Sequence, residues 1–139
     1  MNLKKILFLP IGLVVSATGC TGLGPNATYY MGTTSFNYDT SYSPYMVKLN
    51  GMEIGGGGGG MNTSAVKLGL QLITWGESNS KKKHQAKNHV MLTKEDLQGV
   101  KYLAVHLYPD DTVEITTSNN WPNPTTKGDA WYDKIKNTK

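Results

Sequence analysis

Hydrophobic and polar residues alternate along much of this chain, and a two-residue period is typical of half-buried β-strands. The clearest predicted strand spans residues 65–75. We expect one of its faces to carry four apolar side chains: Val66, Leu68, Leu70 and Leu72. Residues 29–38 are mostly aromatic, threonine or serine, a composition that also favours a strand. The pattern therefore predicts a chain built mainly from strands.

The dipeptide Asn50-Gly51 predicts a β-hairpin, because both positions of its tight turn need a positive φ. Before the turn, Tyr45, Val47 and Leu49 are expected to share one face. The three residues after the turn are expected to form a short returning strand.

A second hairpin is predicted from residues 101–108 and 112–118, joined through a Pro-Asp-Asp turn. Its first strand has two expected faces, one with Leu103, Val105 and Leu107 and the other with Tyr102, Ala104, His106 and Tyr108. Asp110 and Asp111 are adjacent in the turn, where their side chains point apart. We expect them to form the turn and not to act as a catalytic acid and base.

Two short helices are also predicted. Thr93 is expected to cap the first, with Asp96 facing back toward it. Asp129 is expected to cap a C-terminal helix whose Trp131 and Ile135, four residues apart, dock on the sheet. The predicted fold class is therefore mainly β, a small antiparallel sandwich or meander with one or two short helices.

The first twenty residues have the layout of a secretory signal: two lysines, an apolar stretch too short to cross a bilayer as a mature helix, and small residues leading into Cys20. This ending resembles the lipobox of bacterial lipoproteins, where the signal is cut before a cysteine that becomes acylated. Ala17 departs from the pattern, which usually has Leu, Val or Ile there. We expect a lipoprotein signal peptide over residues 1–19 and a lipid on Cys20. The alternative, a plain secretory signal beside a chance cysteine, would export an unusual lone thiol.

Cleavage would leave 120 of the 139 residues, with residues 20–28 as a lipidated tether and residues 29–139 as a single β-rich domain. Thr21 stands where an Asp would resemble an inner-membrane retention signal. We therefore expect a lipid anchor in the bacterial cell envelope, in the outer membrane and facing the periplasm. The formal charge of +4 includes the two leader lysines, and the remainder is too small and dispersed to indicate nucleic-acid binding.

Three histidines are the candidate metal ligands or acid–base groups. His84 and His89 lie in or beside a polar loop at residues 77–88, and His106 lies in a strand. This spacing aims no two of them at one ion, so we expect no metal site. No Gly-x-Ser-x-Gly elbow occurs either. We expect no catalytic residues, no cofactor and no enzymatic activity.

Two low-complexity segments have several possible roles. The six glycines Gly55 to Gly60 lack the Gly-Lys-Ser/Thr ending of a phosphate-binding loop, which favours a flexible or closely approached loop, or a loop without function. Lys81-Lys82-Lys83 with Lys87 makes a basic loop. It is suited to contact anionic lipid, to solubilise the protein, or to steer an acidic protein partner.

The middle of the chain resembles a family of small bacterial lipoproteins classed as a domain of unknown function. The resemblance covers residues 29–118, and it rests on four features in order: Ser35-Phe36-Asn37-Tyr38, Asn50-Gly51, the glycine run, and Val105-His106-Leu107. Many members carry a Cys-Cys pair just after the glycines, where this chain has Ser64-Ala65. Members are often encoded beside lipase effectors of the type VI secretion system.

The resemblance implies an immunity protein that binds a secreted phospholipase effector at the membrane and blocks it. A lipid anchor, a β scaffold and protruding loops suit that role, and we expect the 77–88 loop, the glycine loop and the region of Trp121 to form the contact surface. The alternative is a structural or sensory envelope lipoprotein that binds cell wall or an assembly complex.

Overall fold

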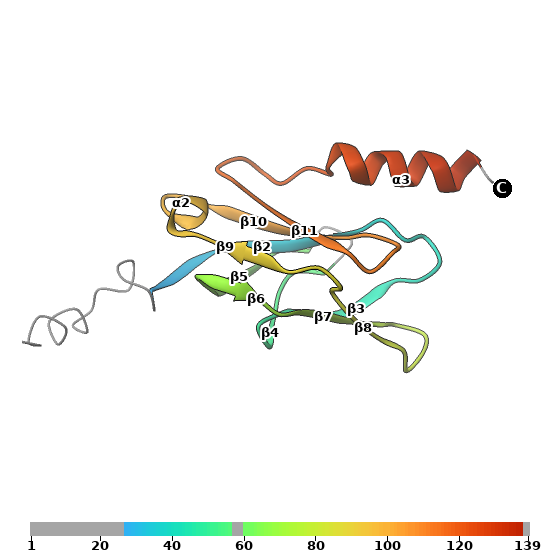
Figure 1. The fold of residues 1–139 in the computed structure, drawn as a ribbon, viewed down its shortest axis with the longest axis horizontal. Coiled ribbons are helices and arrows are strands. Elements are labelled where there is room, and N and C mark those ends of the chain that lie inside the picture. Colours follow the sequence, from blue (N-terminus) through green and yellow to red (C-terminus); the bar gives the residue numbers. More distant parts are fainter. Residues whose placement is uncertain (1–26, 57–59, 138–139) are drawn as a thin grey trace, which may run out of the picture.

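The computed structural model describes residues 27–56 and 60–137. The predicted signal peptide and Cys20 lie outside the described residues. The fold is mainly β, with two four-stranded sheets, a two-stranded ribbon and two helices, as the alternation pattern predicts (Figure 1).

The first sheet has the strand order β11 (Val113–Ser118), β10 (Tyr102–Leu107), β2 (Thr28–Asn37) and β5 (Asn62–Lys67). β10 pairs antiparallel with β11, which confirms the predicted second hairpin. β10 also pairs with β2, and this pair is parallel, with Val105 opposite Ser35. β2 and β10 therefore begin at the same end of the domain and finish together at the other.

The second sheet has the strand order β4 (Met52–Glu53), β3 (Pro44–Leu49), β7 (Ile73–Glu77) and β8 (Lys83–Gln85). Asn50 and Gly51 have φ values of 54° and 84° in the turn between β3 and β4, as the predicted hairpin requires. The ribbon consists of β6 (Gly69–Gln71) and β9 (Val90–Leu92).

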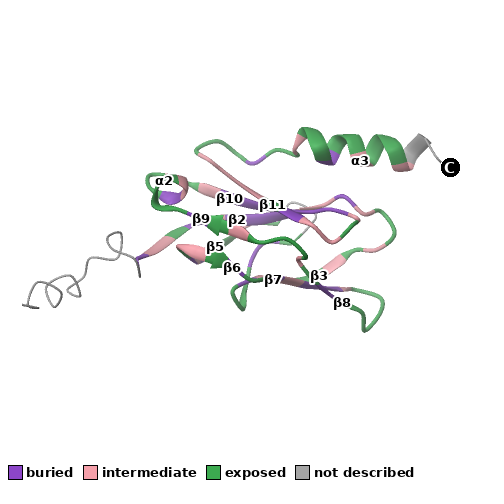
Figure 2. Ribbon diagram, viewed as in Figure 1, coloured by how far each residue is buried: buried purple, intermediate pink, exposed green. Residues whose placement is uncertain are grey.

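The core lies between the sheets, and its buried residues concentrate on the central strands (Figure 2). Leu103, Val105 and Leu107 face it from β10, and Val47, Leu49, Ile73 and Trp75 face it from the second sheet. The other face of β10 is buried as well, because α3 (Thr126–Asn137) lies over the outer side of the first sheet (Figure 1). The predicted two faces of β10 are therefore both confirmed, and both are covered.

The single strand expected at residues 65–75 is wrong. Gly69 has a φ of 99°, which ends β5 and reverses the alternation, so the chain continues as two further strands. Leu70 and Leu72 consequently point outward, with 60% and 50% of their surfaces exposed, while Gln71 is buried. The side-chain amide of Gln71 donates to the carbonyls of Lys67 and Gly69, which satisfies this polar group inside.

The predicted face of β3 needs a similar correction. Met46 has a φ of 53°, and the pairing of β3 with β7 shifts between Tyr45 and Lys48. Such a bulge turns the residues before it relative to those after it. Val47 and Leu49 face the core as expected, but Tyr45 is 56% exposed on the outside.

The helices are partly as predicted. α2 (Lys94–Leu97) has the expected capping box, with Thr93 and Asp96 bonded reciprocally. α3 begins earlier than expected, at Thr126, and the hydroxyl of Thr125 accepts the amide N–H of Gly128. The cap is therefore Thr125 and not Asp129. Tyr132 contacts the sheet, since its hydroxyl donates to the carbonyl of Asn37.

Gly128→Ala is expected to lower the free energy of unfolding by about 2 kcal/mol. A Cβ at this position would overlap the ring of Tyr38, which is buried and hydrogen-bonded at its hydroxyl and so has no room to move. On an undocked helix the same change would stabilise by about 1 kcal/mol, so the sign of the effect reports the packing of α3. Urea denaturation measures it. In a Tyr38→Ala background the substitution should become stabilising, and stabilisation in the wild-type background would contradict this packing.

Candidate functional site

His106, one of the three candidate histidines, lies fully buried beneath α3. Its ring stacks on Phe36 at 5.1 Å and on Tyr38 at 5.8 Å between ring centroids, and Tyr108 extends the stack on the far side of Tyr38. These four aromatic side chains alternate along β2 and β10 on the outer face of the sheet. The cluster is the surface on which α3 docks.

Hydrogen bonds hold both ring nitrogens of His106. Nδ1 lies 2.8 Å from the Tyr38 hydroxyl, which also accepts the backbone N–H of Thr125 at 3.1 Å. Nε2 lies 2.8 Å from the Thr116 hydroxyl. Burial lowers the pKa of His106 to about 4, so the ring is neutral at physiological pH. Both ring nitrogens are used within the fold.

His84 was expected in a loop, and this is wrong: it lies on β8 and is 8% exposed. The segment 77–88 contains the end of β7, a turn and β8, because Gly76 pairs with Lys83. The imidazole stacks on the rings of Tyr42 and Trp75, at 5.0 and 5.2 Å between centroids. Trp75 Nε1 donates to the Tyr42 hydroxyl at 2.7 Å, so these two rings lie side by side against the imidazole.

Two carboxylates flank the His84 ring. Nε2 lies 2.8 Å from Glu77 Oε2, and Nδ1 lies 2.8 Å from Asp111 Oδ1. Each ring nitrogen of His84 therefore has a carboxylate oxygen within hydrogen-bonding distance. The hydrogen bond from His84 also holds the pKa of Glu77 below its usual value. Asp111 belongs to the turn between β10 and β11, so His84 links the two sheets.

The positions of the three histidines do not favour a shared metal site. His84 and His106 lie on different sheets, and His89 is exposed just before β9. Within residues 27–56 and 60–137, no three His, Cys, Asp or Glu side chains are placed to share a metal ion. Asp110 and Asp111 point apart as expected: Asp110 accepts hydrogen bonds from Thr112 within the turn. The expected lack of enzymatic activity stays a prediction.

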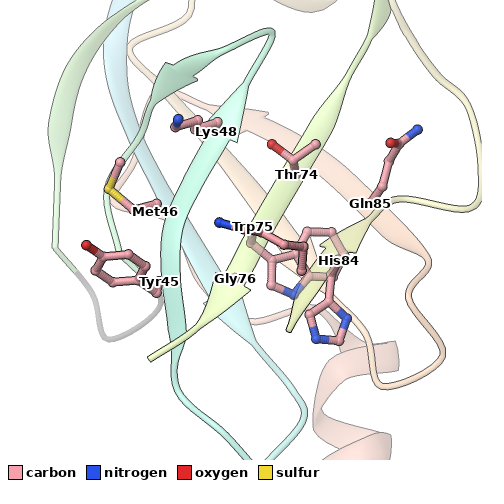
Figure 3. A pocket seen from close by; sticks show the side chains of 9 residues that line it. Tyr45, Met46, Lys48, Thr74, Trp75, Gly76, His84 and Gln85 are labelled. Atoms are coloured by element: carbon pink, nitrogen blue, oxygen red, sulfur yellow. The ribbon is translucent and has the colours of Figure 1, made fainter. Parts of the chain in front are cut away.

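The candidate binding site lies on the outer surface of the second sheet (Figure 3). An open hollow of about 450 Å³ is bordered by β3, β7 and β8, and a second of about 360 Å³ adjoins it at the β7–β8 turn. The surface around both hollows, here called the lysine face, consists of Tyr45, Met46, Lys48, Lys81, Lys82 and Lys83. Figure 3 shows Tyr45 and Met46 together along β3, with Trp75 and His84 against each other beside them.

The lysine face combines positive charge with exposed apolar surface. In the described part of the chain, none of its four lysines lies within 4.0 Å of a carboxylate, although Lys48 is paired with Glu53 across β3 and β4 and Glu77 borders the second hollow near Lys82. Tyr45 is 56% exposed and Met46 is 38% exposed at the bulge of β3. The stacked rings of Tyr42, His84 and Trp75 support the sheet from behind. Charge at the rim and aromatic surface at the centre are typical of protein-binding sites.

The lysine face lies at the end of the domain opposite the predicted tether. β2 begins at Thr28 and runs to Asn37, and β3 starts at that second end, where Pro44 pairs with Glu77. The β7–β8 turn therefore lies far from the start of β2, as Figure 1 shows.

The other predicted contact regions lie elsewhere. Gly55 and Gly60 pass close to the middle of β2, where a Cβ on Gly55 would overlap the carbonyls of Gly60 and Thr33. The close-approach interpretation therefore holds for Gly55, while residues 57–59 lie outside the described residues. Trp121 is 59% exposed in the segment between β11 and α3. It does not join the lysine face.

Sequence reasoning identified Lys81, Lys82 and Lys83 of this site but missed Lys48, Tyr45 and Met46. Alternation placed Tyr45 in the core, and nothing in the residue pattern marks a non-glycine residue such as Met46 for a positive φ. The only sequence signal for this site was the run of three lysines, because lysine side chains are rarely buried. The tertiary structure places Tyr45 and Met46 beside these lysines.

No helix in the described part of the chain is long and apolar enough to cross a membrane. In comparisons with known proteins, no family model matches the sequence, and no curated protein or solved structure is detectably similar to it. The resemblance to the family of small lipoproteins therefore stays a prediction.

Proposed function

We propose that this chain is a lipid-anchored binding protein of the bacterial envelope that holds an acidic protein partner on its lysine face. The supporting observation is the position of that face: lysines border exposed Tyr45 and Met46, and three of them, in the β7–β8 turn and β8, lie at the end of the domain opposite the start of β2. A partner in the periplasm reaches this end without obstruction by the membrane.

The partner that the lipoprotein resemblance implies is a phospholipase effector of the type VI secretion system. Binding at the lysine face would hold the lipase at a distance from the lipid surface and block its access to substrate. The protein needs no catalytic group for this role, because inhibition follows from occupying the partner. Lysine charge would speed the encounter, and the apolar centre would slow dissociation.

Affinity capture tests the proposal. The lipidated protein, tagged at its C-terminus, is mixed with periplasmic extract that contains the neighbouring lipase, and the retained proteins are identified by mass spectrometry. We expect near-stoichiometric retention of the lipase and inhibition of its activity. Retention of cell-wall or assembly components would instead support a structural envelope lipoprotein. Failure to retain a lipase that is demonstrably present would overturn the immunity role.

Charge reversal on the lysine face is expected to weaken lipase binding about tenfold at low salt. The test variant is Lys82→Glu with Lys83→Glu, and titration calorimetry measures the dissociation constant. The matched control is Lys67→Glu with Lys94→Glu, which changes the net charge equally at the opposite end. Equal weakening by both variants would show that net charge, and not the lysine face, attracts the partner.

A further inference from the structure

A second exposed surface lies on the outer side of the first sheet, at the end where β2 begins. Gly32 has no side chain, and the position of a Cβ there lies 3.0 Å from the Tyr102 ring and 3.1 Å from Met61 Sδ. The Tyr102 ring meets Trp121 edge to face at 5.8 Å between centroids. Tyr30 precedes Gly32 by two residues on β2 and therefore points to the same side. These residues, Tyr30, Met61, Tyr102 and Trp121, are here called the anchor-end patch.

The anchor-end patch is open to solvent. Tyr30 is 68% exposed and Trp121 is 59% exposed, whereas the other end of the same sheet face is covered by α3. Large aromatic side chains that protrude beside one another usually mark an interaction surface. Among the described residues, the only ring that contacts Trp121 is Tyr102. Packing in the core therefore does not explain why the Trp121 indole is exposed.

We infer that the anchor-end patch rests in the interface of the lipid bilayer that holds Cys20. Six residues lie between Cys20 and Ala27, so the seven Cα-to-Cα steps that join them span at most about 25 Å even when fully extended. Tyr30 follows three residues later, which keeps the patch within reach of the membrane. Trp and Tyr are the side chains that favour the head-group region, because each has an apolar ring and one polar group.

The apolar rings, and not charge, would provide the attraction. Lys67, Lys94 and Lys101 lie at this end of the domain, but Glu95 and Asp96 of α2 oppose them. We therefore expect membrane contact of the patch to depend weakly on salt. Contact there would turn the lysine face outward, toward the periplasm. The inference rests on the lipid anchor of the proposed function, and it adds a fixed orientation to that anchor.

Fluorescence quenching in vesicles tests this orientation. The full lipidated chain is placed in phosphatidylethanolamine–phosphatidylglycerol vesicles whose acyl chains are brominated close to the head group. Trp131→Phe retains Trp121 and the buried Trp75, and Trp121→Phe is the matched control that retains Trp131. We expect the lipids to quench most of the Trp121 emission and to shift it to the blue, with little quenching in the control.

The outcomes separate this inference from the proposed function. Unquenched Trp121 in a protein whose mass shows the acylated Cys20 would overturn the orientation and leave the anchor intact. A mass without acyl chains would overturn both. Protection of Trp121 from acrylamide in unanchored Cys20→Ser protein, without vesicles, would show that a second copy covers the patch and would also overturn the inference.

Discussion

The free energy of unfolding is expected to fall by about 3 kcal/mol between neutral pH and a pH of about 4 through His106 alone. The buried ring has a pKa of about 4, against 6.5 for an unperturbed histidine, because burial disfavours its charged form. Each of its nitrogens already has a hydroxyl partner, Tyr38 at Nδ1 and Thr116 at Nε2. A second ring proton would turn the nitrogen that accepts a hydrogen bond into a donor and so break that bond.

The sign of this effect follows from proton binding. Between pH 4 and pH 6.5 the unfolded chain binds a proton at His106 and the folded chain does not. Acid therefore favours unfolding across this window. The stabilising contribution of neutral His106 is complete above pH 6.5. Below pH 4 His106 is protonated in both the folded and the unfolded state, so it no longer changes the free energy of unfolding as the pH falls.

Urea denaturation across this pH range measures the effect, with His106→Gln as the control. Glutamine keeps polar atoms in the site but does not titrate, so the variant is less stable at neutral pH and should lose less stability in acid. The difference between the two pH profiles isolates His106 from the carboxylates, which titrate in both proteins. Parallel profiles for wild type and variant would show that His106 is not held neutral by burial.

His84→Ala is expected to lower the free energy of unfolding by about 3 kcal/mol at neutral pH. Removal of the ring opens a cavity beside Tyr42 and Trp75, whose rings lie 5.0 and 5.2 Å from the imidazole between centroids. It also removes the link between Glu77 on β7 and Asp111 in the β10–β11 turn. The two sheets would then lose a direct connection at the end that carries the lysine face.

His84→Phe is the matched variant for separating these contributions. Phenylalanine keeps a ring stacked on Tyr42 and Trp75 but donates no hydrogen bond to either carboxylate. We expect its loss of stability to be clearly smaller than that of His84→Ala, because the cavity is filled. Urea denaturation followed by the fluorescence of Trp75 measures both. A loss in His84→Ala below about 1 kcal/mol would contradict a structural role for the stacked ring.

Several elements were determined by local sequence alone. Asn50-Gly51 encodes its hairpin because both residues accept a positive φ, and Thr93 with Asp96 encodes its capping box. The alternation along β10 indicated both of its faces. The mainly β class follows from the same two-residue period. In each case the deciding interaction joins residues that are close in sequence, so the pattern carries the information.

At other positions, long-range contacts in the tertiary structure override the local alternation of polar and apolar residues. The phase reversal at Gly69 and the bulge at Met46 expose Leu70 and Tyr45, since pairing with distant strands determines which side faces the core. Contacts across the sheets place His84 against Tyr42, Trp75 and Asp111. The sequence by itself specified strands, turns and a basic loop. Only the packing of the strands brought the lysines of the β7–β8 turn beside exposed Tyr45 and Met46, at the end of the domain opposite the start of β2.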